Sequence, residues 1–102
     1  MNKFRLEILS VDGIVFKEEI TSASFPTISG IITVLLGHVS LLTKLIGGEI
    51  VIGTLSGMKR IAISGGFLEI NCNNISVVAD FVAYVHKANK QKIRQAMELA
   101  KN

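Results

Sequence analysis

The alternation of apolar and polar residues divides this chain of 102 residues into two parts that meet near residue 86. Before that point, apolar residues alternate with polar ones or form short runs, and pairs of turn-forming residues separate the runs. Alternation with period two is typical of strands that bury one face. Since short strands follow each other about every ten residues, the pattern predicts a mainly β fold, an antiparallel sandwich or barrel.

The beginning of the chain predicts a β-hairpin. Residues 4–8 alternate apolar and charged side chains, and Asp12-Gly13 is a strong hairpin turn signal. The return strand is expected to start at residue 14 and to run toward residue 25. Glu18-Glu19 interrupt it, at a bulge or an exposed edge. We expect Pro26 to end this strand, because proline cannot donate a backbone hydrogen bond.

Six shorter strands are expected in the middle of the chain, at residues 31–35, 40–44, 49–54, 58–64, 67–71 and 75–79. Turn-forming pairs separate them, namely Gly37-His38, Gly47-Gly48, Ser56-Gly57, Gly65-Gly66 and Asn73-Asn74. The apolar run from Ile31 to Leu36 has two interpretations. It is either a strand buried on both faces or a partly exposed segment that binds a partner.

The C-terminal residues 86–102 have a different pattern. They contain good helix formers and no Gly or Pro, and one apolar stripe recurs at helical spacing: Ile93, Ala96, Met97 and Ala100. The sequence therefore predicts an N-terminal β domain at 1–85 and a single short helix at 86–102. Because such a helix is marginal alone in water, we expect Ile93 and Met97 to dock it on the sandwich or on a partner.

Charge and cysteine content limit the function classes. Up to His86 the chain holds six Lys/Arg and seven Asp/Glu, whereas five Lys/Arg and one Asp/Glu follow, so the body is near neutral and the tail is basic. A nucleic-acid binder more usually carries its positive charge across a folded face. The lone Cys72 excludes an internal disulfide and fits a reducing, bacterial-type cytoplasm. No apolar run approaches the ~18 residues of a membrane span, and the initial Met favours a complete chain.

Catalytic motifs are not evident in the sequence. Gly48 and Gly53 have the glycine spacing of a phosphate-binding loop, but Thr54 and Leu55 follow in place of Lys and Ser/Thr. Ser64-Gly65-Gly66 lacks the first glycine of a nucleophile elbow. One Cys and two His, well apart in sequence, form no recognisable zinc site. We therefore expect no catalytic residue, no cofactor and no metal.

Three polar residues keep alternative interpretations. His38 could act as a general base with Asp80 nearby, or it could be a turn or interface residue. Asp80 could equally end a strand through backbone hydrogen bonds. Cys72 lacks a basic neighbour that would activate its thiol, so we expect a passive turn residue.

The chain also resembles a known family, the epsilon subunit of bacterial and chloroplast F-type ATP synthases, over about residues 3–82. The resemblance rests on Pro26-Thr27-x-x-Gly30, Ile32-x-Val34-Leu35-x-Gly37-His38 and x-Ser40-Leu41-Leu42-Thr43. Further matches are Phe4-x-Leu6-x-Ile8-Leu9-Ser10-x-Asp12-Gly13, Gly48-Glu49, Ile63-Ser64-Gly65-Gly66-Phe67-x-Glu69 and Val77-x-Ala79-Asp80. Together these motifs are specific, although each alone is weak.

The resemblance implies a ten-stranded antiparallel β-sandwich followed by a helical hairpin. It implies a non-catalytic subunit of the central stalk that links the gamma subunit to the c-ring and couples proton flow to ATP synthesis. It places the chain peripherally on the cytoplasmic face of the bacterial inner membrane, without nucleic acid; we expect a monomer in isolation. The residues expected to contact the c-ring and gamma are Thr27, Ser29, Gly30, Ile31, Gly37, His38 and Ser40.

The sequence departs from the family at several points. Ile31 stands where an acidic residue is frequent, so an apolar contact must replace any salt bridge there. Leu36 replaces the usual proline. The family's second C-terminal helix is not found in these 102 residues, and Lys90 and Gln91 disagree with its ATP-binding motif when the motif's arginine is aligned on Arg94. We expect weak or absent hairpin inhibition and no ATP sensing.

Two other function classes stay open. A small β-barrel nucleic-acid-binding module would need exposed aromatic residues on a basic sheet face, whereas the five Phe residues are expected mostly in the core. An enzyme built around His38 and Asp80 would need a cleft that they share.

Overall fold

The computed structural model describes residues 4–35 and 40–85. Within them the chain forms eight strands and no helix. The strands are β1 (Phe4–Ser10), β2 (Gly13–Ile20), β3 (Ser22–Thr27), β4 (Gly30–Val34), β5 (Ser40–Thr54), β6 (Gly57–Asn71), β7 (Asn74–Ala79) and β8 (Val82–Val85). The mainly β prediction is thus confirmed for this part of the chain. The predicted helix at 86–102 and the turn at Gly37-His38 lie outside the described residues.

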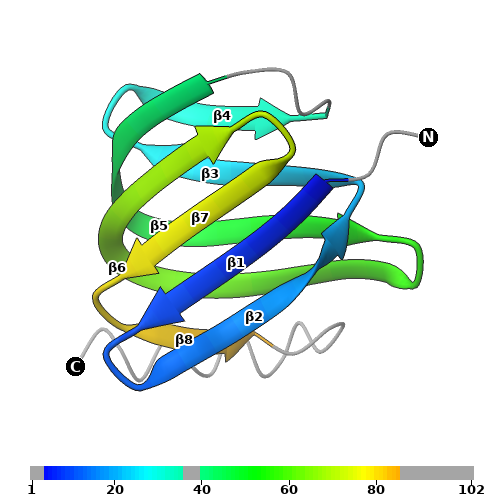
Figure 1. The fold of residues 1–102 in the computed structure, drawn as a ribbon. Coiled ribbons are helices and arrows are strands. Elements are labelled where there is room, and N and C mark those ends of the chain that lie inside the picture. The colour runs from blue at the N-terminus through cyan, green and yellow to red at the C-terminus, as the bar shows by residue number, and fades with distance from the viewer. Residues whose placement is uncertain (1–3, 36–39, 86–102) are drawn as a thin grey trace.

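The strands form one sheet that folds over into two layers (Figure 1). Its order is β2-β1-β7-β6-β5-β3-β4, and β8 also pairs with β6. The second half of β6 pairs with β7, whereas its first half pairs with β8. We call β2, β1, β7 and the adjoining halves of β6 and β5 the front layer. The back layer consists of β8, the other halves of β6 and β5, β3 and β4.

Two long strands connect the layers, in place of four of the short strands that the residue pattern predicts. β5 and β6 have 15 residues each and stay paired from Ser40↔Asn71 to Thr54↔Gly57. Gly47-Gly48 and Gly65-Gly66 were predicted as turns, but they lie inside these strands. The residue pattern predicts eight strands in all. Each long strand replaces two of them, residues 14–25 form two strands instead of one, and β8 is additional, so the described residues again hold eight strands. The ten strands that the resemblance implies are not confirmed.

Glycine permits the bend of β6 between the layers. Gly65 and Gly66 have φ angles of 147° and 151°, a region that residues with a Cβ rarely adopt. A Cβ on Gly66 would also overlap the carbonyl oxygen of Val78 on the neighbouring strand β7. The backbone thus requires glycine at Gly66 for two independent reasons, its dihedral angles and the close approach of β7.

The predicted return strand at 14–25 is wrong in two respects. It is divided at Thr21 into β2 and β3, and Thr21 N–H donates to Gly53 O at 2.8 Å where the chain passes to the back layer. Pro26 lies within β3, opposite Ile31 of β4. The register between β3 and β5 shifts between Ser24 and Thr27, so no ladder hydrogen bond is needed from the nitrogen of Pro26 there.

The core fills the space between the two layers and consists of aliphatic residues and three Phe. Every strand with described side chains except the short β8 contributes fully buried apolar residues: Phe4, Leu6, Ile8, Phe16, Ile20, Ala23, Phe25, Val34, Leu45, Ile50, Ile52, Ile61, Ile63, Leu68, Ile70, Ile75, Val77 and Ala79. Burial of one such large side chain contributes about 1.5–3 kcal/mol. The prediction of a mostly buried Phe set is wrong for Phe67 and Phe81, which are exposed on the surface.

Candidate partner-binding surface

A row of apolar side chains crosses the outer face of the front layer. Leu9 of β1 is paired with Ile14 of β2 and with Val78 of β7, and Val78 is paired with Phe67 of β6. At the other end, Phe67 is paired with Lys44 of β5, whose carbonyl accepts a hydrogen bond from Ile28 N–H at 3.1 Å. We call Ile14, Leu9, Val78, Phe67 and Ile28 the apolar row.

The apolar row faces outward because its members alternate with core residues on the same strands. Val77 and Leu68, which adjoin Val78 and Phe67 in sequence, are fully buried. By contrast, Phe67 is 57% exposed and Val78 is 54% exposed. Successive residues of a strand point to opposite faces, so the row does not contribute to the core.

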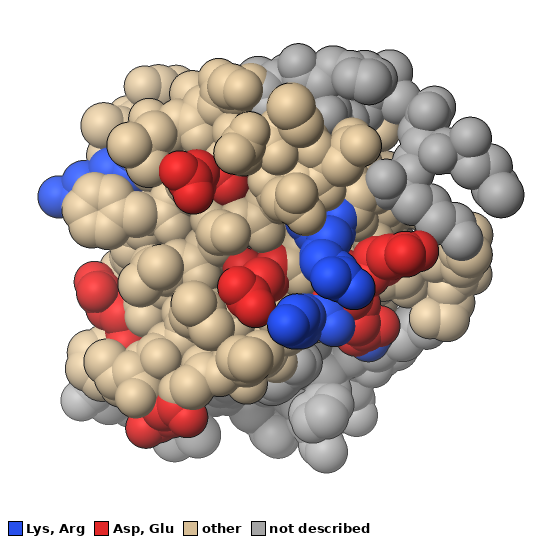
Figure 2. Space-filling model, in the orientation of Figure 1, with Lys and Arg blue, Asp and Glu red and all other residues tan. Residues whose placement is uncertain are grey.

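Residues of β5 widen this apolar surface. Leu42 and Ile46 lie on either side of Lys44 on the same face, and both are exposed. Glu69 is paired with Leu42, so acidic and basic side chains border the apolar residues. Figure 2 shows this face with a broad uncharged area between red and blue side chains. Contiguous exposed apolar residues with a polar border are typical of a protein-binding surface.

The charge of the same face bears on the nucleic-acid alternative. Phe67 is exposed beside Lys44, as a base-stacking platform would require. However, Glu69 and Glu7 share the face, and Glu7 lies 3.8 Å from Lys17 in an ion pair. The face is therefore mixed in charge rather than basic, which disfavours phosphate binding.

The turn between β3 and β4 holds four of the predicted contact residues. Thr27 is only 2% exposed; its hydroxyl donates to Gly30 O at 2.6 Å and accepts from Ser29 N–H at 3.2 Å. Gly30 has a φ angle of 115°, which suits glycine. Ile31 follows at the start of β4 and is 77% exposed. Thr27 thus positions the turn. Its exposed residues are Ile28, which also belongs to the apolar row, and Ser29, Gly30 and Ile31.

The remaining predicted contact residues are separate from this turn or outside the described part. Ser40 is exposed at the start of β5, opposite Asn71. Thr27 pairs with Leu45, which lies five residues after Ser40 on β5. At ordinary strand rise this separates Leu45 from Ser40 by about 17 Å. Gly37 and His38 lie outside the described residues, as do Ile93 and Met97 of the predicted helix. The structure therefore brings Thr27, Ser29, Gly30 and Ile31 together, but not Ser40.

The apolar run from Ile31 to Leu36 can now be interpreted as far as Leu35. Ile31, Thr33 and Leu35 are exposed, whereas Val34 is buried and Ile32 is partly buried. The strand is thus buried on one face only, which agrees with the partner-binding alternative. The sequence showed this run as apolar, but it could not show that, among the described strands, β4 pairs with β3 alone.

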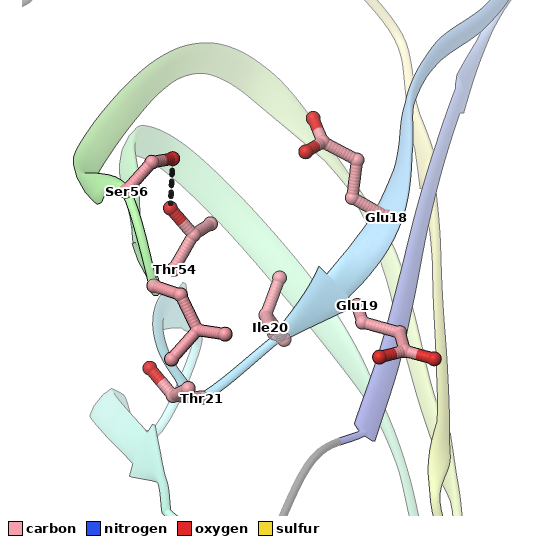
Figure 3. A pocket seen from close by; sticks show the side chains of 7 residues that line it. Glu18, Glu19, Ile20, Thr21, Thr54 and Ser56 are labelled. Atoms are coloured by element: carbon pink, nitrogen blue, oxygen red, sulfur yellow. Dashed lines mark hydrogen bonds between the residues drawn. The ribbon is translucent and has the colours of Figure 1, made fainter.

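A shallow pocket lies between the end of β2 and the β5–β6 hairpin (Figure 3). Its volume is about 190 Å³, and its lining comprises Glu18, Glu19, Ile20, Thr21, Thr54, Leu55 and Ser56. Several of the polar groups here already have partners within the protein. Thr54 Oγ1 donates to Gly57 O at 2.9 Å, and Glu18 accepts from Lys59 Nζ at 3.0 Å. We do not assign a binding site to this pocket.

The other candidate residues are placed as follows. Asp80 is exposed directly after β7, and its backbone N–H donates to Gly65 O at 3.1 Å. Cys72 is exposed in the turn between β6 and β7, with a φ angle of 56°. Since His38 is outside the described residues, the pairing of His38 with Asp80 stays untested. The described ranges contain no cluster of three potential metal ligands and no helix long and apolar enough to cross a membrane.

Comparison with known proteins extends these observations. Residues 3–84 match the family model of the ATP synthase delta/epsilon chain, beta-sandwich domain. The ATP synthase epsilon chain of Endomicrobium trichonymphae is 56% identical over 102 residues, which is all of this chain and 74% of the relative. The ATP synthase epsilon chain of Campylobacter fetus is 32% identical over 99% of this chain and 79% of its own length.

Two solved structures share the fold. A chain of the Euglena gracilis mitochondrial ATP synthase OSCP/F1/c-ring structure superposes with a TM-score of 0.79 at 21% identity. The superposition covers 99% of the present chain and 65% of the Euglena chain. A chain of the Tetrahymena thermophila mitochondrial ATP synthase central stalk/c-ring structure superposes with a TM-score of 0.65 at 10% identity. This superposition covers 95% of the present chain and 87% of the Tetrahymena chain. The fold, the family match and the sequence relatives agree, and we conclude that this chain belongs to the ATP synthase delta/epsilon family, with its strands forming the family's β-sandwich domain.

Proposed function

We propose that the chain is a non-catalytic rotor subunit of a proton-translocating F-type ATP synthase, which links gamma to the c-ring and has no active site of its own. The apolar row on the front layer carries this proposal. Family membership supplies the context, and the Euglena and Tetrahymena structures are named for the F1/c-ring and for the central stalk and c-ring. An exposed apolar surface on a β-sandwich suits a subunit that works by contact.

Two surfaces divide the proposed contacts. The apolar row, widened by Leu42 and Ile46, offers the larger area and is assigned to gamma. The β3–β4 turn with Ser29, Gly30 and Ile31 is assigned to the c-ring. Ser40 at the start of β5, which lies apart from the turn, is assigned a separate contact with gamma or the c-ring, together with Gly37 and His38. A rotor subunit needs such contacts with both neighbours, since torque has to pass from one to the other.

The sandwich supplies the rigidity that torque requires. β5 and β6 are hydrogen-bonded to each other through both layers, and β3 is paired with β5, so the two surfaces belong to one hydrogen-bonded sheet. Apolar packing between the layers resists shear, because interiors are close-packed. The chain thus couples proton-driven rotation to ATP synthesis by transmitting force rather than by chemistry.

The remaining expectations belong to this proposal. The subunit is placed on the cytoplasmic face of the bacterial inner membrane, held there through the complex, and is monomeric in isolation. Residues 86–102 form a helix that Ile93 and Met97 dock on the sandwich or on gamma. Hairpin inhibition and ATP sensing are weak or absent.

Binding of the full chain to a gamma–c-ring assembly from the same organism tests the proposal. We expect the wild type to co-purify with the assembly and Leu42→Glu to bind at least about tenfold more weakly, because a carboxylate would be desolvated beside Glu69. Leu55→Glu is the matched control, since Leu55 is 80% exposed on the β5–β6 hairpin, away from the apolar row. Failure of the wild type to bind, or ATP turnover by the purified chain alone, would refute the proposal.

A further inference from the structure

Lys44 is a positive charge set among apolar side chains on the outer face of the front layer. It lies on β5 between Leu42 and Ile46, and it is paired with Phe67 of β6. These three apolar neighbours are 48% to 73% exposed, and Lys44 is exposed as well. A partner that covers the apolar neighbours therefore also approaches the ammonium group of Lys44.

The other four positive charges of the described residues have acidic neighbours within the chain. Arg5 of β1 lies directly opposite Glu19 of β2. Three others form ion pairs of 3.0 to 3.8 Å with acidic side chains: Lys17 with Glu7, Lys59 with Glu18 and Arg60 with Glu49. Over residues 4–35 and 40–85, Lys44 is thus the one cation with neither an ion pair nor an acidic residue directly opposite it.

Glu69 shares this part of the face, but it does not neutralise Lys44. Glu69 is paired with Leu42, so it is diagonal to Lys44 across β5 and β6. Diagonal neighbours in a sheet are about 7–8 Å apart. The ion pairs of the described residues do not include one between Lys44 and Glu69. The ammonium group of Lys44 is therefore stabilised by water until a partner covers it.

Covering Lys44 without a counter-charge would weaken association. An ammonium group that loses its water and gains no partner is strongly unfavourable. A carboxylate opposite it removes this penalty and accepts a charge-assisted hydrogen bond. The apolar contacts around Lys44 are not directional, so they would let a partner slide along the apolar row. One ion pair among them fixes the register of the two surfaces.

We infer that the partner places the carboxylate of an Asp or Glu opposite Lys44, and that Lys44 thereby sets the register of the contact. This inference rests on the proposed function, in which the apolar row binds gamma, and it names the side chain that gamma has to supply. Lys44 is accordingly a specificity-determining residue of the surface, whereas the apolar row supplies most of the contact area.

Carbodiimide cross-linking tests the inference directly. The reagent activates a carboxylate, and a lysine amine in contact with that carboxylate displaces the activating group as a urea and forms an amide. The full chain bound to the gamma–c-ring assembly should yield a peptide in which Lys44 is joined to an Asp or Glu of gamma, identified by mass spectrometry. Lys44→Arg should still bind but should not yield this peptide, because a guanidinium group does not form the amide.

Affinity measurements on the same assembly supply the second readout. We expect Lys44→Arg to stay within about threefold of wild type, Lys44→Met to bind about tenfold more weakly and Lys44→Glu about a hundredfold more weakly. The matched control is Lys17→Met, which removes the same charge from a lysine that Glu7 already pairs. It should stay within about threefold of wild type.

Each remaining outcome contradicts either the inference or the proposed function. Binding of Lys44→Met as tight as that of wild type overturns the inference, and so does a bound wild type in which Lys44 is not cross-linked. A cross-link to Glu69 or to the c-ring also overturns it, as does a tenfold loss in Lys17→Met. If Leu42→Glu is still impaired in these cases, the proposed function stands. No binding by the wild type refutes the proposed function instead.

Discussion

The core and the apolar row contain the same kinds of residue on the same strands, and they differ only in the face that each residue occupies. On β7, Val77 is fully buried while Val78 is 54% exposed. On β6, the neighbours Leu68 and Phe67 differ in the same way. The inward residue of each pair stabilises the fold, because folding removes it from water. The outward residue stays more than half exposed after folding, so much of its apolar surface is left for contact with a second molecule.

This comparison separates two quantities that experiments can measure independently. Substitution in the core is expected to change the free energy of unfolding, whereas substitution in the apolar row is expected to change partner affinity. The predictions below test this separation, beginning with the largest expected loss of stability.

Truncation of Phe25 should produce the largest loss of stability. Phe25 is fully buried on β3, and Phe25→Ala is expected to lower the free energy of unfolding by about 3–5 kcal/mol, since the transfer and cavity contributions add. Urea titration followed by circular dichroism measures the effect. Phe81→Ala is the matched control, because Phe81 is 71% exposed, and it should change stability little. Equal losses in the two variants would contradict the assignment of Phe25 to the core.

A smaller loss of stability is expected from substitution at the bend that joins the two layers. Gly66→Ala forces a Cβ onto the carbonyl oxygen of Val78 and an unfavourable φ, and should cost about 2 kcal/mol or more. Gly47→Ala on the partner strand β5 is the control: its Cβ would lie 3.4 Å from Ser64 O, at the limit of ordinary contact. Thermal unfolding of both variants measures the difference. A Gly66→Ala protein as stable as Gly47→Ala would show that β7 can move away at no cost.

Sequence reasoning succeeded where one local signal determined the structure. Hairpin turns do occur at Asp12-Gly13 and Asn73-Asn74, each one residue earlier than predicted: the turn residues are Val11-Asp12 and Cys72-Asn73. Gly13, the first residue of β2, has a positive φ of 113°. The alternation at β1 likewise identified Phe4, Leu6 and Ile8 as buried. In each case the information lies within a few neighbouring residues.

Sequence reasoning failed where the local structure depended on strands that are distant in sequence. Gly65-Gly66 has the composition of a turn, but the pairing of β6 with β5 on both sides of it makes a bend instead. Pro26 is tolerated inside β3 because the register with β5 shifts beside it. Phe67 is apolar at a position that only the sheet order shows to be outward. For the candidate surface, the sequence identified the β3–β4 turn but not the apolar row, whose members come from five separate segments.

The smallest change in stability, and the sharpest test of the comparison, is expected at Phe67. Phe67→Thr replaces one good strand former by another at an exposed strand position, so the free energy of unfolding should change by no more than about 0.5 kcal/mol. Affinity for the gamma–c-ring assembly should nevertheless fall about tenfold or more, because a central aromatic anchor is lost from the apolar row. Leu68→Thr, one residue further along β6, supplies the opposite case: it should lower stability and reduce binding only to the extent that it unfolds the protein. If Phe67→Thr lowered stability as strongly as Leu68→Thr while leaving the affinity of the folded protein unchanged, the apolar row would belong to the structural core, and its assignment to a partner would be wrong.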